Sequence, residues 1–246
     1  METCMDAERL TDKLVSWIRD KVLAAPAKGV VTGMSGGIDS SVLAVLCQRA
    51  FPQSTLGMIM PCHSNPEDEE HARTVASKFS IQTRVVVLDS VFDTLLKVLP
   101  NDQSDPAVTR MAEANIKARL RMLTLYYFAN RLNCVVAGAG NRSELSVGYF
   151  TKYGDSGVDI LPLGNLVKRE VRELAGFLGI PKVIIDKTPS AGLWPGQTDE
   201  DELGFSYEEL DLYLTAGEAP RELKEEIESM IAASEHKRQP PPVAGF

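Results

Sequence analysis

Short apolar runs alternate with amphipathic segments along the first 140 residues. The runs at 29–33, 55–60, 83–88 and 134–137 are continuous, which predicts parallel strands buried on both faces. Between them, apolar residues recur three and four positions apart and predict helices, at 6–25, 39–49, 67–79, 90–98 and 107–131. This alternation predicts an α/β fold with a doubly wound, mostly parallel sheet covered by helices on both faces.

The pattern changes after residue 147. Helices are predicted at 167–178, 206–215 and 220–233, but residues 149–163 and 187–204 show no period. A long segment without period is either disordered or a functional lid. We favour a lid at 187–204, because it carries Trp194 and ordered-looking elements flank it. We interpret residues 1–246 as one domain, with C-terminal helices within 206–234.

Composition narrows the class of protein. The 246 residues carry a net charge of −8, which disfavours non-specific nucleic-acid binding. The four cysteines form no CxxC pair, so reduced thiols and a cytoplasmic location are expected. The first residues lack the apolar core of a signal peptide, and no apolar run is long enough to span a membrane. We therefore expect neither nucleic acid nor membrane as a partner.

The segment 33–41, Gly-Met-Ser-Gly-Gly-Ile-Asp-Ser-Ser, joins the first predicted strand to a helix. Glycines let the backbone approach a phosphate closely, and the free N–H groups at the helix start point towards it. Ser35, Ser40 and Ser41 add hydroxyl donors. The segment is no Walker A loop, because no lysine follows the glycines.

Asp39 stands where that lysine would be. A carboxylate beside a polyphosphate is repelled unless a cation separates them, so Asp39 implies Mg²⁺. The alternative is an ordinary glycine-rich turn with Asp39 as a helix-start residue. Glu144 follows a second glycine turn at 138–141 and would meet Asp39 if both turns open on one crevice. Glu144 is equally compatible with a simple helix start.

Four other polar segments have competing interpretations. The acids at 67–70 suit a solvated helix start better than a metal site. The stretch 149–155 suits a small-molecule pocket or a surface hairpin. Lys168 and Arg169 begin a helix, where cations oppose the dipole, so a phosphate partner explains them better than helix stability does. Residues 236–238 have the composition of a solvated basic tail.

The loop at 33–41 resembles the signature of the PP-loop ATP pyrophosphatases, whose fold is Rossmann-like. Further segments, in order along the chain, resemble NAD synthetase. These segments are 33–40, 149–155, 161–164, 168–169, 187–190, 198–204 and 235–238. The resemblance implies a homodimeric, ATP-dependent ligase. Such an enzyme converts deamido-NAD to NAD with ammonia, through an acyl-adenylate, and releases AMP and pyrophosphate.

The resemblance also implies roles for individual residues. Asp39 and Glu144 would bind Mg²⁺, and Asp155 and Lys168 would act in catalysis. The residues implied at deamido-NAD are Arg119, Lys152, Asp159, His236 and Lys237. The residues implied at ATP are Gly33, Met34, Ser35, Gly36, Gly37, Ile38, Asp39, Ser40, Ala139, Lys168 and Ser190.

Two positions depart from the family pattern. Ala139 stands where a hydroxyl residue is frequent, so a contact there would use backbone. Residues 58–60 supply no arginine on the expected adenine side. The chain leaves no room for an amidase domain of about 100–200 residues, so direct use of ammonia is expected. The competing hypotheses are another PP-loop amidating or thiolating enzyme, and a nucleotide sensor without turnover.

Overall fold

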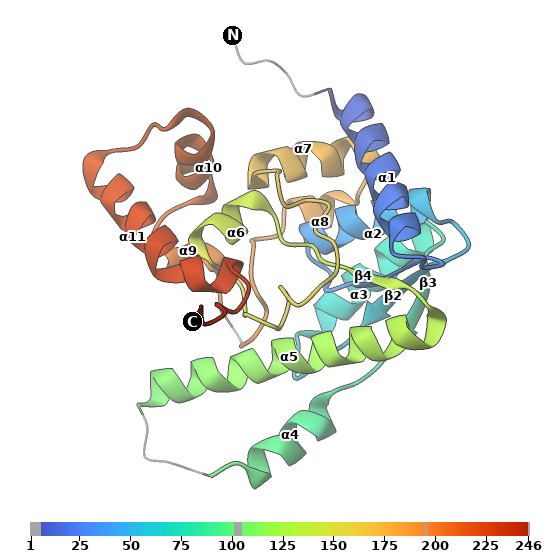
Figure 1. Ribbon diagram of the computed structural model, residues 1–246, viewed down its shortest axis with the longest axis horizontal. Coiled ribbons are helices and arrows are strands. Elements are labelled where there is room, and N and C mark those ends of the chain that lie inside the picture. The colour runs from blue at the N-terminus through green and yellow to red at the C-terminus, as the bar shows by residue number, and fades with distance from the viewer. Residues whose placement is uncertain (1–5, 101–104, 195, 246) are drawn as a thin grey trace.

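The computed structural model describes residues 6–100, 105–194 and 196–245. A parallel sheet lies at its centre in the order β3-β2-β1-β4 (Figure 1). The strands are β1 Val30–Gly33, β2 Thr55–Ile59, β3 Gln82–Val85 and β4 Val135–Ala137. A parallel bridge from Ala137 to Ile160 extends the sheet beyond β4.

Helices cover both faces of the sheet (Figure 1). Val30 and Val135 point to one face, where they share a core with α1 Ala7–Ala24, α2 Ile38–Ala50, α3 Pro66–Lys78 and α7 Lys168–Leu178. Val31 and Val136, the next residues, point to the other face, where α4 Asp89–Val98 and α5 Pro106–Leu132 pack. The predicted doubly wound fold is confirmed.

A third apolar cluster lies beside the sheet. It joins the short helices α6 Arg142–Val147 and α9 Asp199–Leu203 to α10 Tyr207–Ala216 and α11 Arg221–Arg238. The remaining short helix is α8 Lys182–Ile185. Because α10 also packs on α7, this C-terminal group is attached to the helical layer of the sheet.

Some predicted elements need correction. The predicted strand 83–88 is shorter and mostly exposed, because β3 lies at the sheet edge rather than between two neighbours. Three helices, α6, α8 and α9, were missed, since segments this short complete too few turns to show a period. The helix α9 falls inside the segment 187–204, which is therefore not wholly irregular.

The other structural expectations can be checked on the described residues. The acids at 67–70 do begin helix α3, as predicted. Cys47, Cys62 and Cys134 are free thiols. Within the described ranges, no helix combines the length and apolarity needed to cross a membrane. The sequence also predicts a turn-rich break at 101–106, most of which falls outside the described residues.

Candidate active site

The glycine loop follows β1 and leads into α2, as the sequence predicted. Gly36 has a φ of +79°, and a Cβ there would lie 2.2 Å from the Asp68 carbonyl oxygen, so only glycine fits. Two hydroxyls fasten the turn: Ser40 Oγ and Ser41 Oγ donate to the Gly37 carbonyl at 3.0 and 2.7 Å. The loop is therefore held in shape by its own side chains.

The remaining loop residues divide between core and surface. Met34 and Ile38 are buried in the core, so only their backbone can face a nucleotide. Ser35 is exposed, and its N–H donates to Ser40 Oγ at 3.2 Å. Gly33 ends β1 and is partly exposed.

Lys168 joins the two carboxylates that the sequence proposed as metal ligands. Its Nζ lies 2.6 Å from Asp39 Oδ2 and 3.0 Å from Glu144 Oε1. Asn141 Nδ2 donates to the other oxygen of Asp39 at 2.8 Å. Asp39 lies in the first turn of α2 and Glu144 in the first turn of α6, so the helices that follow the two glycine turns meet at Lys168. Asn141 is fully buried and also caps α6 by accepting the Glu144 N–H at 3.0 Å.

Charge in this cluster is unbalanced. Burial lowers the pKa of Lys168, but the carboxylates of Asp39 and Glu144 outweigh that effect and raise it. Burial raises the pKa of Glu144 to about 7, with Asp39 adding to the rise and Lys168 opposing it. One ammonium is therefore shared by two carboxylates. The cluster can accept further positive charge, and its oxygen donors are the kind that Mg²⁺ prefers.

Two tyrosines connect this cluster to α9. Tyr207 Oη lies within hydrogen-bond distance of Glu144 (3.3 Å) and of Asp199 (2.9 Å), and its ring faces Lys168 Nζ at 4.8 Å. Tyr149 Oη contacts Asp199 as well, at 3.1 Å. Burial raises the pKa of Asp199. Sequence reasoning missed Asn141, Tyr207 and Asp199, although a Thr198 cap before an acidic run was a signal for α9.

The proposed lid packs against helices of the sheet layer. Lys117 Nζ, from α5, donates to the Leu193 carbonyl at 2.7 Å. The Arg110 guanidinium lies 5.1 Å from the centre of the Trp194 ring. Lys187 forms an ion pair with Asp68 on α3, beside the glycine loop. The segment thus lies across α3 and α5.

Four of the five residues implied at deamido-NAD lie near one another. Arg119 is exposed and donates to the Lys152 carbonyl at 3.3 Å, while Lys152 Nζ donates to the carbonyl of exposed His236. Lys237 Nζ donates to the carbonyls of Gly148 and Phe150 at 2.8 and 3.0 Å. The end of α11 is therefore joined to the segment after α6.

Asp159 and Asp155 are held by backbone contacts. Asp159 accepts the Val136 N–H at 2.7 Å and the Tyr126 hydroxyl at 2.9 Å, and these bonds fasten its loop to β4. Asp155 accepts the Thr151 N–H at 2.8 Å. Among the described residues, no hydrogen bond or ion pair joins Asp155 to Lys168, so the structure does not bring the two implied catalytic residues together.

Three further positions bear on the expected ATP site: Ala139, Ser190 and the end of β2. Ala139 is partly buried against the core, and Ser190 is exposed, with its hydroxyl accepting the Gly192 N–H at 3.1 Å. Arg121, from α5, donates to the Met60 carbonyl and to Ser64 Oγ at 3.2 and 3.1 Å. An arginine therefore does reach the end of β2, from a helix distant in sequence.

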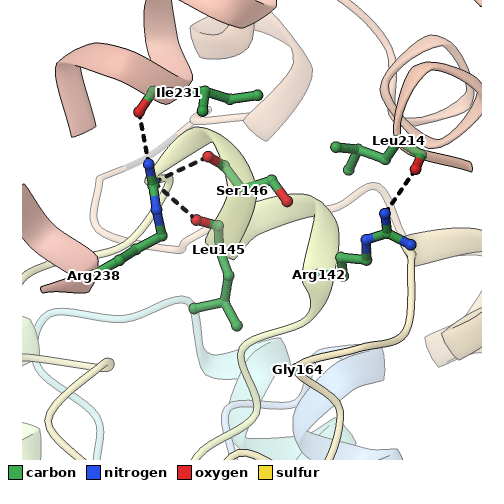
Figure 2. A pocket seen from close by; sticks show the side chains of 7 residues that line it. All are labelled: Arg142, Leu145, Ser146, Gly164, Leu214, Ile231 and Arg238. Carbon is green, nitrogen blue, oxygen red and sulfur yellow. Dashed lines mark hydrogen bonds between the residues drawn. The ribbon is translucent and has the colours of Figure 1, made fainter. Parts of the chain in front are cut away.

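A cavity of about 260 Å³ lies behind α6, between α10 and α11 (Figure 2). Arg238 donates to the carbonyls of Leu145, Ser146 and Ile231, and Arg142 donates to the carbonyl of Leu214. These bonds fasten α6 to both C-terminal helices. The interpretation of residues 236–238 as a solvated tail is therefore wrong for Lys237 and Arg238, whose charged groups are committed to carbonyls.

A glycine loop after a parallel strand, an acid on the next helix and a buried lysine beside it define an α/β protein of the PP-loop class. The family model "NAD synthase" matches residues 10–241. The NH(3)-dependent NAD(+) synthetase of Carboxydothermus hydrogenoformans is 52% identical over 96% of this chain and 97% of its own. The chain belongs to the NAD synthase family.

Solved structures of related proteins have the same fold. The NMN synthetase from Francisella tularensis gives a TM-score of 0.92 at 36% identity, covering 99% of this chain and 100% of its own. The NH3-dependent NAD synthetase from Campylobacter jejuni, in complex with nitrate, gives a TM-score of 0.82 at 29% identity. That match covers 98% of this chain and 100% of the other. The resemblance seen in the sequence is confirmed.

Proposed function

We propose that this protein is an ammonia-dependent NAD synthetase, which amidates deamido-NAD with ATP and releases AMP and pyrophosphate. The observation that carries the proposal is the buried Lys168, shared by Asp39 and Glu144 beside a preformed glycine loop. Relatives that match nearly the whole chain are named NH(3)-dependent NAD(+) synthetases, which supports the use of ammonia.

ATP is bound by the loop Gly33, Met34, Ser35, Gly36, Gly37, Ile38, Asp39 and Ser40, with Lys168, Ser190 and the backbone of Ala139. Backbone N–H groups at the start of α2 receive the phosphates. Asp39 and Glu144 would hold Mg²⁺, which would supply positive charge beside the phosphates. The surplus carboxylate in their cluster supports this assignment, because two anionic groups share one ammonium.

The reaction has two steps. A nicotinate carboxylate oxygen attacks the α-phosphorus, and the bond to the pyrophosphate leaving group breaks. Ammonia then attacks the acyl carbon, AMP leaves, and ammonia loses a proton. Lys168 stabilises the charge that gathers on the phosphates. The segment 187–204 excludes water from the adenylate. Asp155 orients or deprotonates ammonia.

Deamido-NAD is bound by Arg119, Lys152, Asp159, His236 and Lys237. Hydrogen bonds join three of these residues, Arg119, Lys152 and His236, and Lys237 follows His236 in the chain, which supports a shared role. A second substrate deserves the same test. The solved structure from Francisella tularensis is named an NMN synthetase, so the mononucleotide that gives NMN by the same amidation is the alternative.

We also propose a cytoplasmic homodimer. Support for the dimer comes from large apolar side chains exposed on α4 and α5, which include Val91, Val98, Val108, Met111, Leu123 and Tyr127. Light scattering on a size-exclusion column tests it. A native dimer that Leu123→Glu converts to monomer is expected, and a native monomer at all concentrations contradicts it.

The function is tested by mixing protein, MgATP, ammonium and either deamido-NAD or the mononucleotide. NAD and AMP are expected in equal amounts from deamido-NAD, and Asp39→Ala should abolish pyrophosphate release. Faster turnover of the mononucleotide would reassign the substrate. Absence of AMP with both would favour a nucleotide sensor. Turnover with glutamine and no ammonium would contradict direct use of ammonia.

A further inference from the structure

Helix α7, which carries Lys168, has only half of a capping box, in which Glu170 accepts the Val167 N–H at 2.9 Å. Val167 occupies the N-cap position and has no side-chain oxygen to receive the first N–H groups. Asp211, on α10, receives them instead: its Oδ2 accepts the Arg169 N–H at 2.7 Å and its Oδ1 accepts the Lys168 N–H at 3.3 Å. A carboxylate at this end also suits the helix dipole.

The same carboxylate reaches α6. Ser143 Oγ donates to Asp211 Oδ1 at 2.5 Å and accepts the Lys168 N–H at 3.0 Å. Ser143 precedes Glu144 in the chain, so Asp211 fixes the backbone beside both members of the Glu144–Lys168 pair. Ser143 is fully buried and Asp211 is 4% exposed, so water is a poor substitute for either partner.

We propose that Asp211 is a positioning residue, which aims the Lys168 ammonium at Asp39 and Glu144 by holding the first turn of α7 against α6. Asp211 contacts the backbone N–H of Lys168 but not its ammonium, and it acts through Lys168. The importance of Asp211 for catalysis rests on the ATP-binding role proposed for Lys168. The effect of Asp211 on the position of Lys168 is independent of that role.

The variant Asp211→Asn tests this, because it keeps the size of the side chain and loses the charge and one acceptor. In its crystal structure, Lys168 Nζ should leave hydrogen-bond distance of Glu144. We expect kcat to fall about tenfold, with KM for ammonium unchanged. Ser143→Ala, which removes fewer bonds, serves if Asp211→Asn does not fold. Asp6→Asn is the matched control, since Asp6 caps α1 by accepting the Arg9 N–H at 3.0 Å.

The energetic coupling between Asp211 and Lys168, measured with a double variant, separates a positioning role from a general loss of structure. Calorimetry measures the Kd of a non-hydrolysable ATP analogue. Asp211→Asn should raise this Kd about tenfold in the native protein, but by no more than about twofold when Lys168→Met is already present. Equal losses in both backgrounds, or an unmoved Lys168, would overturn the proposal. If Lys168 moves but Lys168→Met binds the analogue normally, positioning stands and the ATP-binding role of Lys168 fails.

Discussion

Replacing Lys168 by methionine removes the ammonium that two carboxylates share and keeps most of the apolar stem. The side chains of Lys168, Asp39 and Glu144 are 3%, 16% and 17% exposed, so water cannot fully replace the lost charge. Asp39 retains the amide of Asn141, while Glu144 retains the hydroxyl of Tyr207 at 3.3 Å. Asp39 is left without its ion pair, and the pKa of Glu144, raised by burial and by Asp39, loses the ammonium that opposes the rise, so Glu144 tends to take up a proton.

Removing one partner of a buried ion pair costs about 3–5 kcal/mol. Because the polar contacts of Asp39 and Glu144 remain, we expect the lower end, about 3 kcal/mol. For a chain of this size each kcal/mol lowers Tm by about 2–4 °C, so a fall of roughly 6–12 °C is expected.

Urea denaturation followed by circular dichroism measures the free energy of unfolding. Lys182→Met is the matched control, because Lys182 is 88% exposed and pairs with Asp186 at 3.9 Å. The free energy of unfolding of Lys182→Met should fall by less than about 0.5 kcal/mol. Adding Asp39→Asn to Lys168→Met should restore part of the stability, because a surplus charge is removed. A loss below about 1 kcal/mol in Lys168→Met, or no recovery in the double variant, would refute this reasoning.

Three other changes follow from the same contacts. Asn141→Ala removes the N-cap of α6 and a hydrogen bond to Asp39, so urea denaturation should show that the free energy of unfolding falls by about 2–5 kcal/mol. Gly36→Ala forces a Cβ against a carbonyl and should abolish ATP binding in calorimetry, whereas Gly176→Ala, with open space around it, should raise Tm slightly. Lys117→Met frees the Leu193 carbonyl, so hydrogen exchange should accelerate within 187–194 but not in α2. Unchanged exchange would contradict the lid contact.

The sequence predicted the sheet and the glycine loop because both are local. The strands β1, β2 and β4 lie in short, mostly apolar runs, and the loop carries its glycines and hydroxyls within nine residues, 33–41. Lys168 was found because a cation at a helix start opposes the dipole and needs another reason to be there. The meeting of Asp39 and Glu144 followed from the parallel order of the strands.

Asn141, Tyr207 and Asp211 were beyond reach of the same reasoning. Each is an ordinary residue in its own helix or turn, and its importance arises from a partner distant in the chain. Asp211, for example, lies 42 residues from the N–H that it receives most closely. No periodicity encodes such a contact. Arg121 shows the same limit, because residues 58–60 carry no arginine and the side chain that reaches them comes from α5.

The salt bridge between Asp39 and Lys168 joins residues 129 positions apart. A ribosome will have released the whole glycine loop long before it adds that lysine. The growing polypeptide therefore carries Asp39 without its ammonium partner until α7 emerges. On the role proposed for Lys168, it should not retain nucleotide during most of its synthesis. Competence to bind would arise late and abruptly, when the last third of the chain folds back onto the first.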